Sequence, residues 1–173
     1  MRKSLRMHKA QERWHAESVA YRRQWENYAL THPYMSRYHY EKWISGYNWH
    51  NAAFILCELA GFVLVSKAPT APCEVYLTSL HIYQDGDYII IDYELHKLDD
   101  KHQHWIEVFW AGPHSPARHP DTKHSSYCGS WPEPEQPAIP VGGRAGTYTL
   151  FVRACTTQGL ASPTQSDRVT MVF

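Results

Sequence analysis

The sequence contains none of the short motifs that identify the common enzyme families. Its 173 residues include no Gly-x-Ser-x-Gly, no His-Glu-x-x-His and no Gly-x-Gly-x-x-Gly, the patterns of serine hydrolases, zinc peptidases and dinucleotide-binding enzymes. Residues 142–146 are rich in glycine, but no Lys-Ser or Lys-Thr follows them, so we predict a turn there and not a phosphate-binding loop. We therefore expect a protein that is not an enzyme and that uses no cofactor.

Cysteine is scarce, and no two cysteines form a Cys-x-x-Cys pair. The four cysteines are Cys57, Cys73, Cys128 and Cys155. Their spacing excludes zinc-finger, thioredoxin-like and c-type haem motifs. Nothing in this pattern requires an oxidising compartment, so we expect free thiols.

The sequence also lacks a long hydrophobic run and an excess of charge of one sign. The most apolar stretch, residues 52–65, contains Glu58 and is shorter than the roughly 20 residues that a membrane-spanning helix needs. Lys and Arg number 17, as do Asp and Glu, so no overall charge indicates nucleic acid as a partner. Residues 1–8 are basic with no apolar segment after them, so we expect a frayed arm and no signal peptide.

Aromatic residues are abundant, and in residues 9–31 they indicate an amphipathic helix. They recur there at spacings of 7, 4 and 3, at Trp14, Tyr21, Trp25 and Tyr28. These spacings place the four rings on one helical face. Pro33 ends the helix, because the residue before a proline avoids the helical conformation. Such a stripe is more typical of a packing seam than of a ligand site.

A second helix is predicted for residues 47–60. Ser45 is placed to cap its start and Gly61 to stop it, while Trp49 contributes to a broad apolar side. The two helices together have too few apolar partners for a core of their own. We therefore expect this helical hairpin to pack against the rest of the chain or against a second subunit.

Residues 68–72, Ala-Pro-Thr-Ala-Pro, are predicted to form an extended linker. The linker separates a helical region, residues 1–67, from a β-rich region, residues 73–173, in which apolar residues alternate with a period of two. An Asp-Gly turn is expected within residues 84–87. The predicted strands are residues 73–83, 88–98, 104–111, 147–155 and 169–173, with short strands near 125–131 and 138–141 inside the long segment 112–140.

The strand at residues 147–155 is the clearest of these. Tyr148, Leu150, Val152 and Ala154 fall on one of its faces. Tyr148 lies early in the strand, the position of a tyrosine corner in immunoglobulin-type sandwiches. Six or seven short strands after a linker predict an antiparallel β-sandwich. The fold class we expect is α+β, a pair of helices followed by a sandwich of the fibronectin type III or immunoglobulin kind.

Residues 146–162 resemble the closing strands of fibronectin type III domains. They read Gly-Thr-Tyr-Thr-Leu-Phe-Val-Arg-Ala-Cys-Thr-Thr-Gln-Gly-Leu-Ala-Ser and follow that family's Gly-x-Tyr-x-x-x-Val-x-Ala pattern. The usual Trp of the second strand is missing, which leaves Tyr93 and Trp110 as the candidates to replace it.

A broader resemblance joins residues 25–33, residues 45–49 and residues 107–118. They read Trp-Glu-Asn-Tyr-Ala-Leu-Thr-His-Pro, Ser-Gly-Tyr-Asn-Trp and Glu-Val-Phe-Trp-Ala-Gly-Pro-His-Ser-Pro-Ala-Arg. Together they are similar to uncharacterised bacterial and phage proteins with a helical N-terminal part and a fibronectin-like C-terminal part. This resemblance implies a role in the structure of a phage or phage-like particle.

Histidine offers the one candidate metal site. His102 and His104 would lie on one face of a strand, and His96 on the preceding strand would reach them if the two strands paired as a hairpin. Imidazole suits Zn, Cu or Ni. The alternative is that these are ordinary surface histidines, because the pattern has no fixed spacing beyond one His-x-His.

Two functions from different classes fit these features. The first is a homo-oligomeric structural protein of a phage virion or similar particle, with itself or other particle subunits as partners and no small-molecule substrate. The residues expected at its contacts are Trp14, Tyr21, Trp25, Tyr28 and Trp49. The alternative is a surface module that binds glycans or a metal ion, in which Tyr127 and Trp131 would stack on sugar rings.

Overall fold

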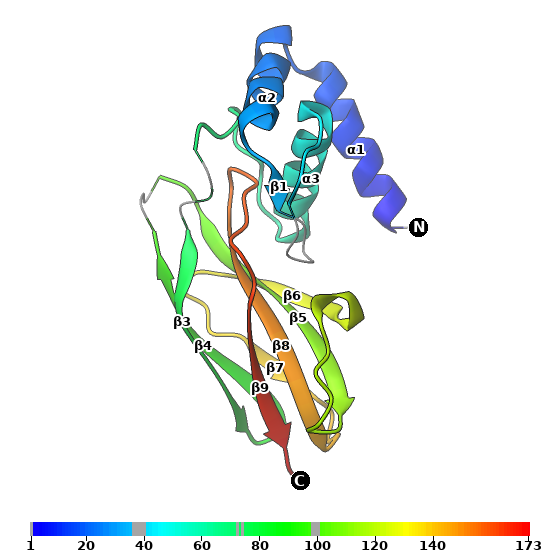
Figure 1. The fold of residues 1–173 in the computed structure, drawn as a ribbon, viewed down its shortest axis with the longest axis vertical. Helices are drawn as coiled ribbons and strands as arrows, with labels where there is room; N and C mark the ends of the chain where they lie inside the picture. The colour runs from blue at the N-terminus through cyan, green and yellow to red at the C-terminus, as the bar shows by residue number, and fades with distance from the viewer. Residues whose placement is uncertain (1, 36–40, 72, 74, 98–100) are drawn as a thin grey trace.

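The computed structural model describes residues 2–35, 41–71, 73, 75–97 and 101–173. In this part of the chain, three helices lie at one end of the molecule and two facing antiparallel β-sheets at the other (Figure 1). The protein is therefore a mixed α+β protein, as expected. Four residues of the predicted segments, at positions 1, 72, 74 and 98, lie outside the described residues.

The helical end contains three helices and a short hairpin. Helix α1 spans Arg2–Ala16, α2 spans Val19–Thr31 and α3 spans Gly46–Leu59, while strands β1 (Tyr34–Met35) and β2 (Glu41–Lys42) pair between α2 and α3. We call this part the helical unit. None of the helices seen in the described residues has the length and apolar character needed to cross a membrane.

The single helix predicted for residues 9–31 is in fact two helices, because the chain breaks at Ser18. This residue is extended, with φ −63° and ψ 157°, and its hydroxyl caps α2 by accepting a hydrogen bond from the backbone N–H of Tyr21. The helical spacing of the aromatic residues continues across Ser18, so it gave no indication of this break. Trp14 and Tyr21 both pack against His50 of α3, although they belong to different helices.

The frayed basic arm expected at residues 1–8 is also corrected, because α1 already begins at Arg2. Farther along α1, the ammonium group of Lys9 lies 2.6 Å from a carboxylate oxygen of Glu58 at the end of α3. This ion pair therefore helps to hold α1 against α3.

Helix α3 begins and ends as predicted. The hydroxyl of Ser45 accepts a hydrogen bond from the backbone N–H of Asn48, and Gly61 follows the helix with a left-handed φ of 79°. Gly46, the first residue of α3, touches the backbone of α2, since a Cβ there would come within 2.5 Å of the backbone nitrogen of Glu26. The absence of a side chain at Gly46 thus permits the close crossing of α2 and α3.

The β-rich region forms a three-stranded sheet, β3-β4-β7, that faces a four-stranded sheet, β6-β5-β8-β9. Apolar side chains from both sheets fill the space between them as one core. The predicted strands and the Asp-Gly turn are confirmed to within a few residues. The strands are β3 (Tyr76–Asp85), β4 (Tyr88–His96), β5 (His104–His114), β6 (Ser126–Pro132), β7 (Ala138–Pro140), β8 (Gly146–Thr156) and β9 (Gln165–Met171), with a 3-10 turn at Thr122–His124.

Strand β8 lies in the middle of the larger sheet, between β5 and β9. Its predicted inward face, Tyr148, Leu150, Val152 and Ala154, is fully buried. The Tyr148 hydroxyl donates a hydrogen bond to the carbonyl of Arg144, four residues upstream, at 3.0 Å. The alternation in the sequence therefore identified the strand that forms the centre of the sandwich.

The helical unit and the sandwich share a second hydrophobic core. Trp105, Cys155 and Leu160 from the sandwich pack in one cluster with the buried residues of all three helices. The ring of Phe62, just after α3, stacks on Trp105 with centroids 4.8 Å apart. The sandwich thus adds three apolar residues to a cluster whose other buried members lie within residues 14–68. The domain boundary predicted at residues 68–72 stays a prediction. The shared hydrophobic core includes residues from both sides of it.

The two parts approach each other closely at Gly159, in the turn after β8. A Cβ at this residue would lie 2.1 Å from the Cβ of Ala53 on α3. Gly159 also has a φ of 79°, in the left-handed region that side chains disfavour. Close by, the backbone N–H of Val65 donates a hydrogen bond to the carbonyl of Thr157 at 3.0 Å. Helix α3 therefore packs against the sandwich at this turn.

We predict that Gly159→Ala destabilises the protein more than Gly61→Ala does. Both glycines have a φ of 79°, but nothing lies within 4 Å of a Cβ built at Gly61. Gly61→Ala should cost about 1–2 kcal/mol for the left-handed conformation alone. Gly159→Ala should cost about 1–3 kcal/mol more, because it overpacks the contact with Ala53. Urea unfolding measures both, and equal losses would contradict the docking described here.

Candidate functional site

A groove on the surface of the helical unit is the first candidate site. It has a volume of about 540 Å³ and lies between α2 and the segment that leads into α3. Two large apolar side chains stand exposed on its walls, Leu30 at 76% and Trp43 at 67%. Its lining residues are Glu26, Ala29, Leu30, Trp43, Ile44, Ser45 and Gly46. We call it the Leu30–Trp43 groove. Exposed aromatic and aliphatic groups beside a hollow are typical of protein contact sites.

A cavity at the junction of the helical unit and the sandwich is the second candidate. It has a volume of about 560 Å³, and its walls include Ile55 and Leu59 of α3, Leu160 of the β8–β9 turn, and Arg153 of β8. This size lies in the range of small-molecule sites. The lining is mainly apolar, and its charged residues are Glu41 and Arg153.

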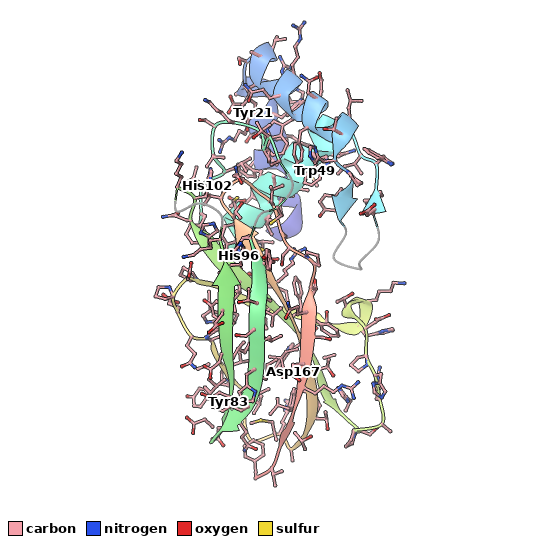
Figure 2. The ribbon with its side chains drawn as sticks, turned by 60° about the vertical axis from the view of Figure 1, so that its left-hand side comes forward. Tyr21, Trp49, Tyr83, His96, His102 and Asp167 are labelled. Carbon is pink, nitrogen blue, oxygen red and sulfur yellow. The ribbon has the colours of Figure 1, made fainter. Side chains whose placement is uncertain are left out.

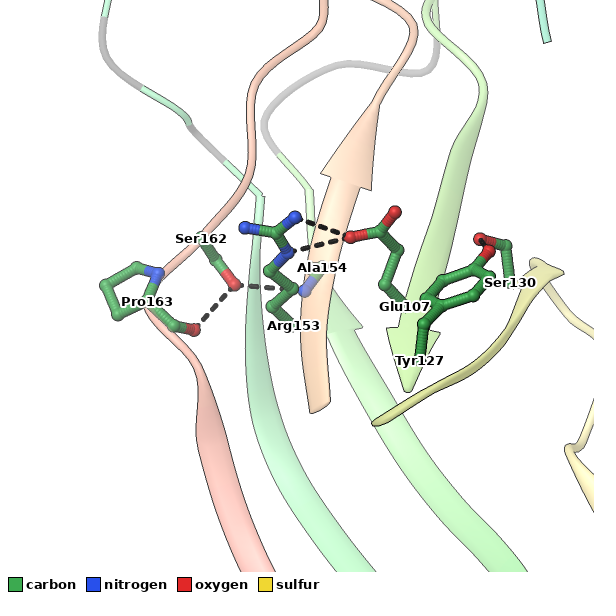
Figure 3. Close-up of polar contacts among 7 residues, drawn as sticks. All are labelled: Glu107, Tyr127, Ser130, Arg153, Ala154, Ser162 and Pro163. Carbon is green, nitrogen blue, oxygen red and sulfur yellow. Dashed lines mark hydrogen bonds and ion pairs between the residues drawn. The ribbon is translucent and has the colours of Figure 1, made fainter. Parts of the chain in front are cut away.

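The charge of Arg153 is already neutralised by Glu107 (Figure 3). Its Nε and Nη2 donate hydrogen bonds of 2.8 and 2.6 Å to the same carboxylate oxygen, and Glu107 is buried. The two residues are directly opposite each other on β8 and β5. Burial alone would lower the pKa of Arg153, but the nearby carboxylate of Glu107 outweighs it and raises that pKa. The pair is therefore an internal ion pair of the sheet that gives a ligand no uncompensated charge.

The five residues predicted to contact another subunit lie inside the helical unit. Trp14, Tyr21, Trp25, Tyr28 and Trp49 are all buried in the core of the chain, and Figure 2 shows Tyr21 and Trp49 among its helices. Their contact with a neighbouring subunit stays a prediction. The exposed large apolar side chains of the helical unit include Leu5, Met7 and Val19 as well as Leu30 and Trp43, and the last two line the Leu30–Trp43 groove.

His50 is at the centre of this aromatic core. Its ring centroid lies 5.2 Å from that of Trp14 and 5.7 Å from those of Tyr21 and Trp25. The hydroxyl of Tyr21, Nε1 of Trp25 and Nε2 of His50 are buried without a hydrogen-bond partner among the described residues. Burial lowers the pKa of His50 and raises that of Tyr21. These side chains are thus held neutral, which suits packing and not proton transfer.

The thiols are equally unsuited to chemistry. Cys57, Cys128 and Cys155 are not in disulfides. Burial raises the pKa of Cys57 to about 12 and that of Cys128 to about 11, and it raises the pKa of Cys155 well above its ordinary value. The reactive form of cysteine is the thiolate. These three residues therefore behave as small apolar groups.

The predicted histidine metal site is not assembled. His96 on β4 stacks on Tyr76 of β3 with centroids 4.7 Å apart, whereas His104 begins β5, opposite Thr156 of β8. The prediction fails because β4 and β5 do not pair and belong to different sheets. Figure 2 shows His96 on its strand and His102 above it. Within the described residues, no three His, Cys, Asp or Glu side chains are placed to hold a metal ion.

The two predicted sugar-stacking residues are on opposite faces of β6. Tyr127 is 40% exposed and packs edge-on against Phe109, with its hydroxyl 2.7 Å from that of Ser130. Trp131 is instead half-buried against the sandwich core. Residues four apart normally share a face of a strand. Strand β6, however, has a bulge between its pairings with Val108 and Phe109, so side chains on the two sides of the bulge alternate in opposite phase.

Sequence analysis missed both Trp43 and the Arg153–Glu107 pair. Trp43 belongs to no periodic pattern, and its only signal was a large aromatic residue two positions before the predicted cap at Ser45. Glu107 occurs in the otherwise apolar strand β5 and Arg153 in β8, and their pairing depends on the strand register.

Comparison with known proteins gives no family for this chain. No family model matches the sequence, and no curated protein matches it. Among solved structures, the chain is similar to the spore cortex lytic enzyme SleM of Clostridium perfringens, with a TM-score of 0.40 and 16% identity over 55% of this chain and 27% of that chain.

The chain is also similar to OgpA from Akkermansia muciniphila. The catalytically inactive form in complex with an O-glycopeptide gives a TM-score of 0.40 and 13% identity over 69% of this chain and 34% of that chain. The wild-type form gives 0.39 and 14% over 70% and 35%. The chain thus spans about a third of the length of these proteins or less.

We predict that acid destabilises the protein partly through His50. Because burial lowers its pKa from 6.5, the unfolded chain takes up a proton at His50 in a pH range where the folded chain does not. The stability from neutral His50 is complete above pH 6.5 and is lost as the pH falls below it. His50→Phe should therefore reduce the loss of unfolding free energy between pH 7.5 and pH 5. His81→Phe, at an exposed position, is the matched control and should leave that loss unchanged.

We predict a second effect on stability from the buried ion pair. Glu107→Leu leaves the Arg153 guanidinium buried without a counter-charge and should cost about 3–5 kcal/mol of unfolding free energy. The double variant that combines Glu107→Leu with Arg153→Met should recover most of that loss, because the two apolar side chains then fill the site. Chemical unfolding of the two variants decides this. A double variant as unstable as Glu107→Leu would contradict the role given to the pair.

Proposed function

We propose that this chain is a non-enzymatic structural protein of a phage virion or similar particle. In this proposal the helical unit makes assembly contacts, and the sandwich is displayed or bridges neighbouring subunits. The observation that carries the proposal is the Leu30–Trp43 groove. Two large apolar side chains on one surface are in unfavourable contact with water. A partner that covers them removes this contact and is thereby stabilised on the surface.

The fold supports a module of the fibronectin type III kind. Seven strands are arranged as a three-stranded sheet against a four-stranded one, with β7 returning to the sheet of β3 and β4. The hydrogen bond from the Tyr148 hydroxyl to the Arg144 carbonyl has the geometry of a tyrosine corner. Folds of this kind carry many unrelated functions, so the proposed role rests on the Leu30–Trp43 groove and not on the fold.

The attachment of the helices to the sandwich supports the assembly role. The shared core around Trp105 and the contact of Gly159 with Ala53 fix the helical unit on one end of the sandwich. A partner bound at the Leu30–Trp43 groove would therefore hold the sandwich in one orientation. A structural subunit needs this property, because its neighbours must occupy defined positions.

A second candidate function is glycan binding by the sandwich, and Tyr127 favours it. This ring is exposed on β6, and its hydroxyl contacts Ser130 beside it. Trp131, the other predicted stacking residue, packs inward and gives it no second platform. A glycan array with the wild-type protein and Tyr127→Ala tests the candidate, which requires binding that Tyr127→Ala abolishes.

We predict that Trp43→Ala and Leu30→Ala each weaken assembly without unfolding the protein. An exposed aromatic anchor at the centre of a contact contributes about 2 kcal/mol or more, equivalent to roughly a 30-fold loss of affinity. Sedimentation of the purified chain, alone and with isolated particles, measures the association, and thermal unfolding checks the fold. Val63→Ala is the matched control, because Val63 is 75% exposed and lies outside the groove.

Three results are informative here. Loss of association in the two groove variants only would support the proposal. Equal loss in Val63→Ala would point to a general surface effect. A wild-type chain that stays monomeric and does not bind particles would overturn the proposed function.

A further inference from the structure

The cavity between the helical unit and the sandwich has walls from both parts of the chain. We call it the junction cavity, and its volume is about 560 Å³. The helical unit supplies one face of α3 and the aromatic residues around β1, while the sandwich supplies Arg153 of β8 and the turn at residues 159–161. A compound bound there touches segments that are brought together only in the folded chain.

The face of α3 that lines the junction cavity is apolar over two of its turns. The lining residues recur three or four positions apart, at Asn48, Ala52, Ile55 and Leu59. Ala52, Ile55 and Leu59 are only half-buried, and none of them belongs to the hydrophobic clusters formed by the described residues. An apolar ligand in the cavity would therefore remove these side chains from water and give them packing partners.

Aromatic rings form another part of the wall. Tyr28 stacks on His32 with centroids 4.2 Å apart, and Trp49 packs edge-on against Tyr28 and Tyr34 at 5.2 and 5.0 Å. The Tyr28 hydroxyl donates a hydrogen bond to the carbonyl of Ala71, and Nε1 of Trp49 donates one to the carbonyl of His32. Because the polar ends of these two rings are already paired within the chain, they offer a ligand apolar ring surface.

Asn51 adds a buried polar group to this lining. The residue is 3% exposed and lines the junction cavity from α3. Its carboxamide oxygen lies 3.5 Å from Nδ1 of His50, whereas its amide nitrogen donates to no group in the described part of the chain. A buried donor is stabilised by an acceptor. Water can accept this hydrogen bond, but it leaves Ile55 and Leu59 wet; a ligand with an acceptor on an apolar body serves both needs.

The charges around the junction cavity favour a neutral ligand. Nε and Nη2 of Arg153 are bonded to the buried carboxylate of Glu107, which neutralises the guanidinium and leaves Nη1 as a second donor (Figure 3). An anion therefore finds no uncompensated positive charge, and Glu41 in the lining repels it. A cation is repelled by Arg153. Moving either ion from water into a mainly apolar cavity also costs free energy.

From these observations we propose that the junction cavity binds a neutral small molecule with an apolar ring system and a carbonyl-type acceptor. The ring system lies against α3 and the aromatic wall around Trp49, and the acceptor receives a hydrogen bond from the amide nitrogen of Asn51. The ligand binds the folded chain alone, so it raises the melting temperature. This inference goes beyond the proposed function and does not depend on it, because no residue lines both the junction cavity and the Leu30–Trp43 groove.

Three naphthalene compounds that differ mainly in charge test the proposal. Naphthaleneacetamide is neutral and carries a carbonyl acceptor, naphthaleneacetate is an anion, and naphthylmethylammonium is a cation. Isothermal titration calorimetry on the full chain measures the dissociation constant of each. The amide should bind roughly tenfold or more tightly than either ion, because only the ions lose charge hydration in the cavity. Equal or tighter binding of an ion would overturn the proposal.

Variants of the lining locate the bound amide. Asn51→Leu removes the donor and should weaken binding roughly fivefold to tenfold. Asn27→Leu is the matched control, because Asn27 is exposed on α2 and does not line the cavity, and it should bind like the wild type. Ala52→Trp places a large ring in the cavity and should abolish binding. Thermal unfolding checks each fold, and if Ala52→Trp does not fold, the two asparagine variants decide.

Two further results would count against the junction cavity as the site. Binding of the amide that is the same in Asn51→Leu and in Asn27→Leu would place the compound elsewhere. A wild-type chain that binds none of the three compounds, as expected if a side chain of a partner protein fills the cavity, would also overturn the proposal. These titrations use the chain alone, whereas the proposed function is tested with particles and groove variants, so the failure of one is distinguishable from the failure of the other.

Discussion

The contact between α3 and the turn after β8 is the interaction on which the rest of this structure depends. Gly159 lets the turn approach Ala53 more closely than any side chain would allow. Around this point, Trp105 and Leu160 join the core that the helices form. Because apolar burial is the main stabilising contribution in a small domain, the helical unit depends on the sandwich. The helical unit and the sandwich are thus joined by one shared hydrophobic core.

This dependence also determines which groups are free for function. The aromatic side chains of the helices pack around His50, and Arg153 and Glu107 neutralise each other's charge. Burial keeps the thiol of Cys155 protonated. What the described surface offers a partner includes shape and apolar area at the Leu30–Trp43 groove. These are the features of a protein that binds other macromolecules, and they agree with the structural role proposed here.

The candidate sites show why residue type alone did not identify a surface. Counting aromatic residues indicated correctly that they matter in the helical region, but Trp25 of the helical stripe is buried, whereas Trp43, which belongs to no periodic pattern, is exposed. A bulge in β6 places Tyr127 and Trp131 on opposite faces. The assignment of β4 and β5 to different sheets separates His96 from His104. In each case the error came from assuming regular local geometry.

The sequence by itself determined the elements whose cause is local. Alternation around Leu150 defined the central strand, and Ser45 with Gly61 defined the ends of α3, because periodicity and capping act within a few residues. The break at Ser18 carried a local signal too, but the aromatic stripe concealed it. Only the tertiary structure decided that the helices pack on the sandwich, that Arg153 meets Glu107, and that Trp43 faces water. Those outcomes depend on strand register and on contacts between residues far apart in the chain, which no local pattern encodes.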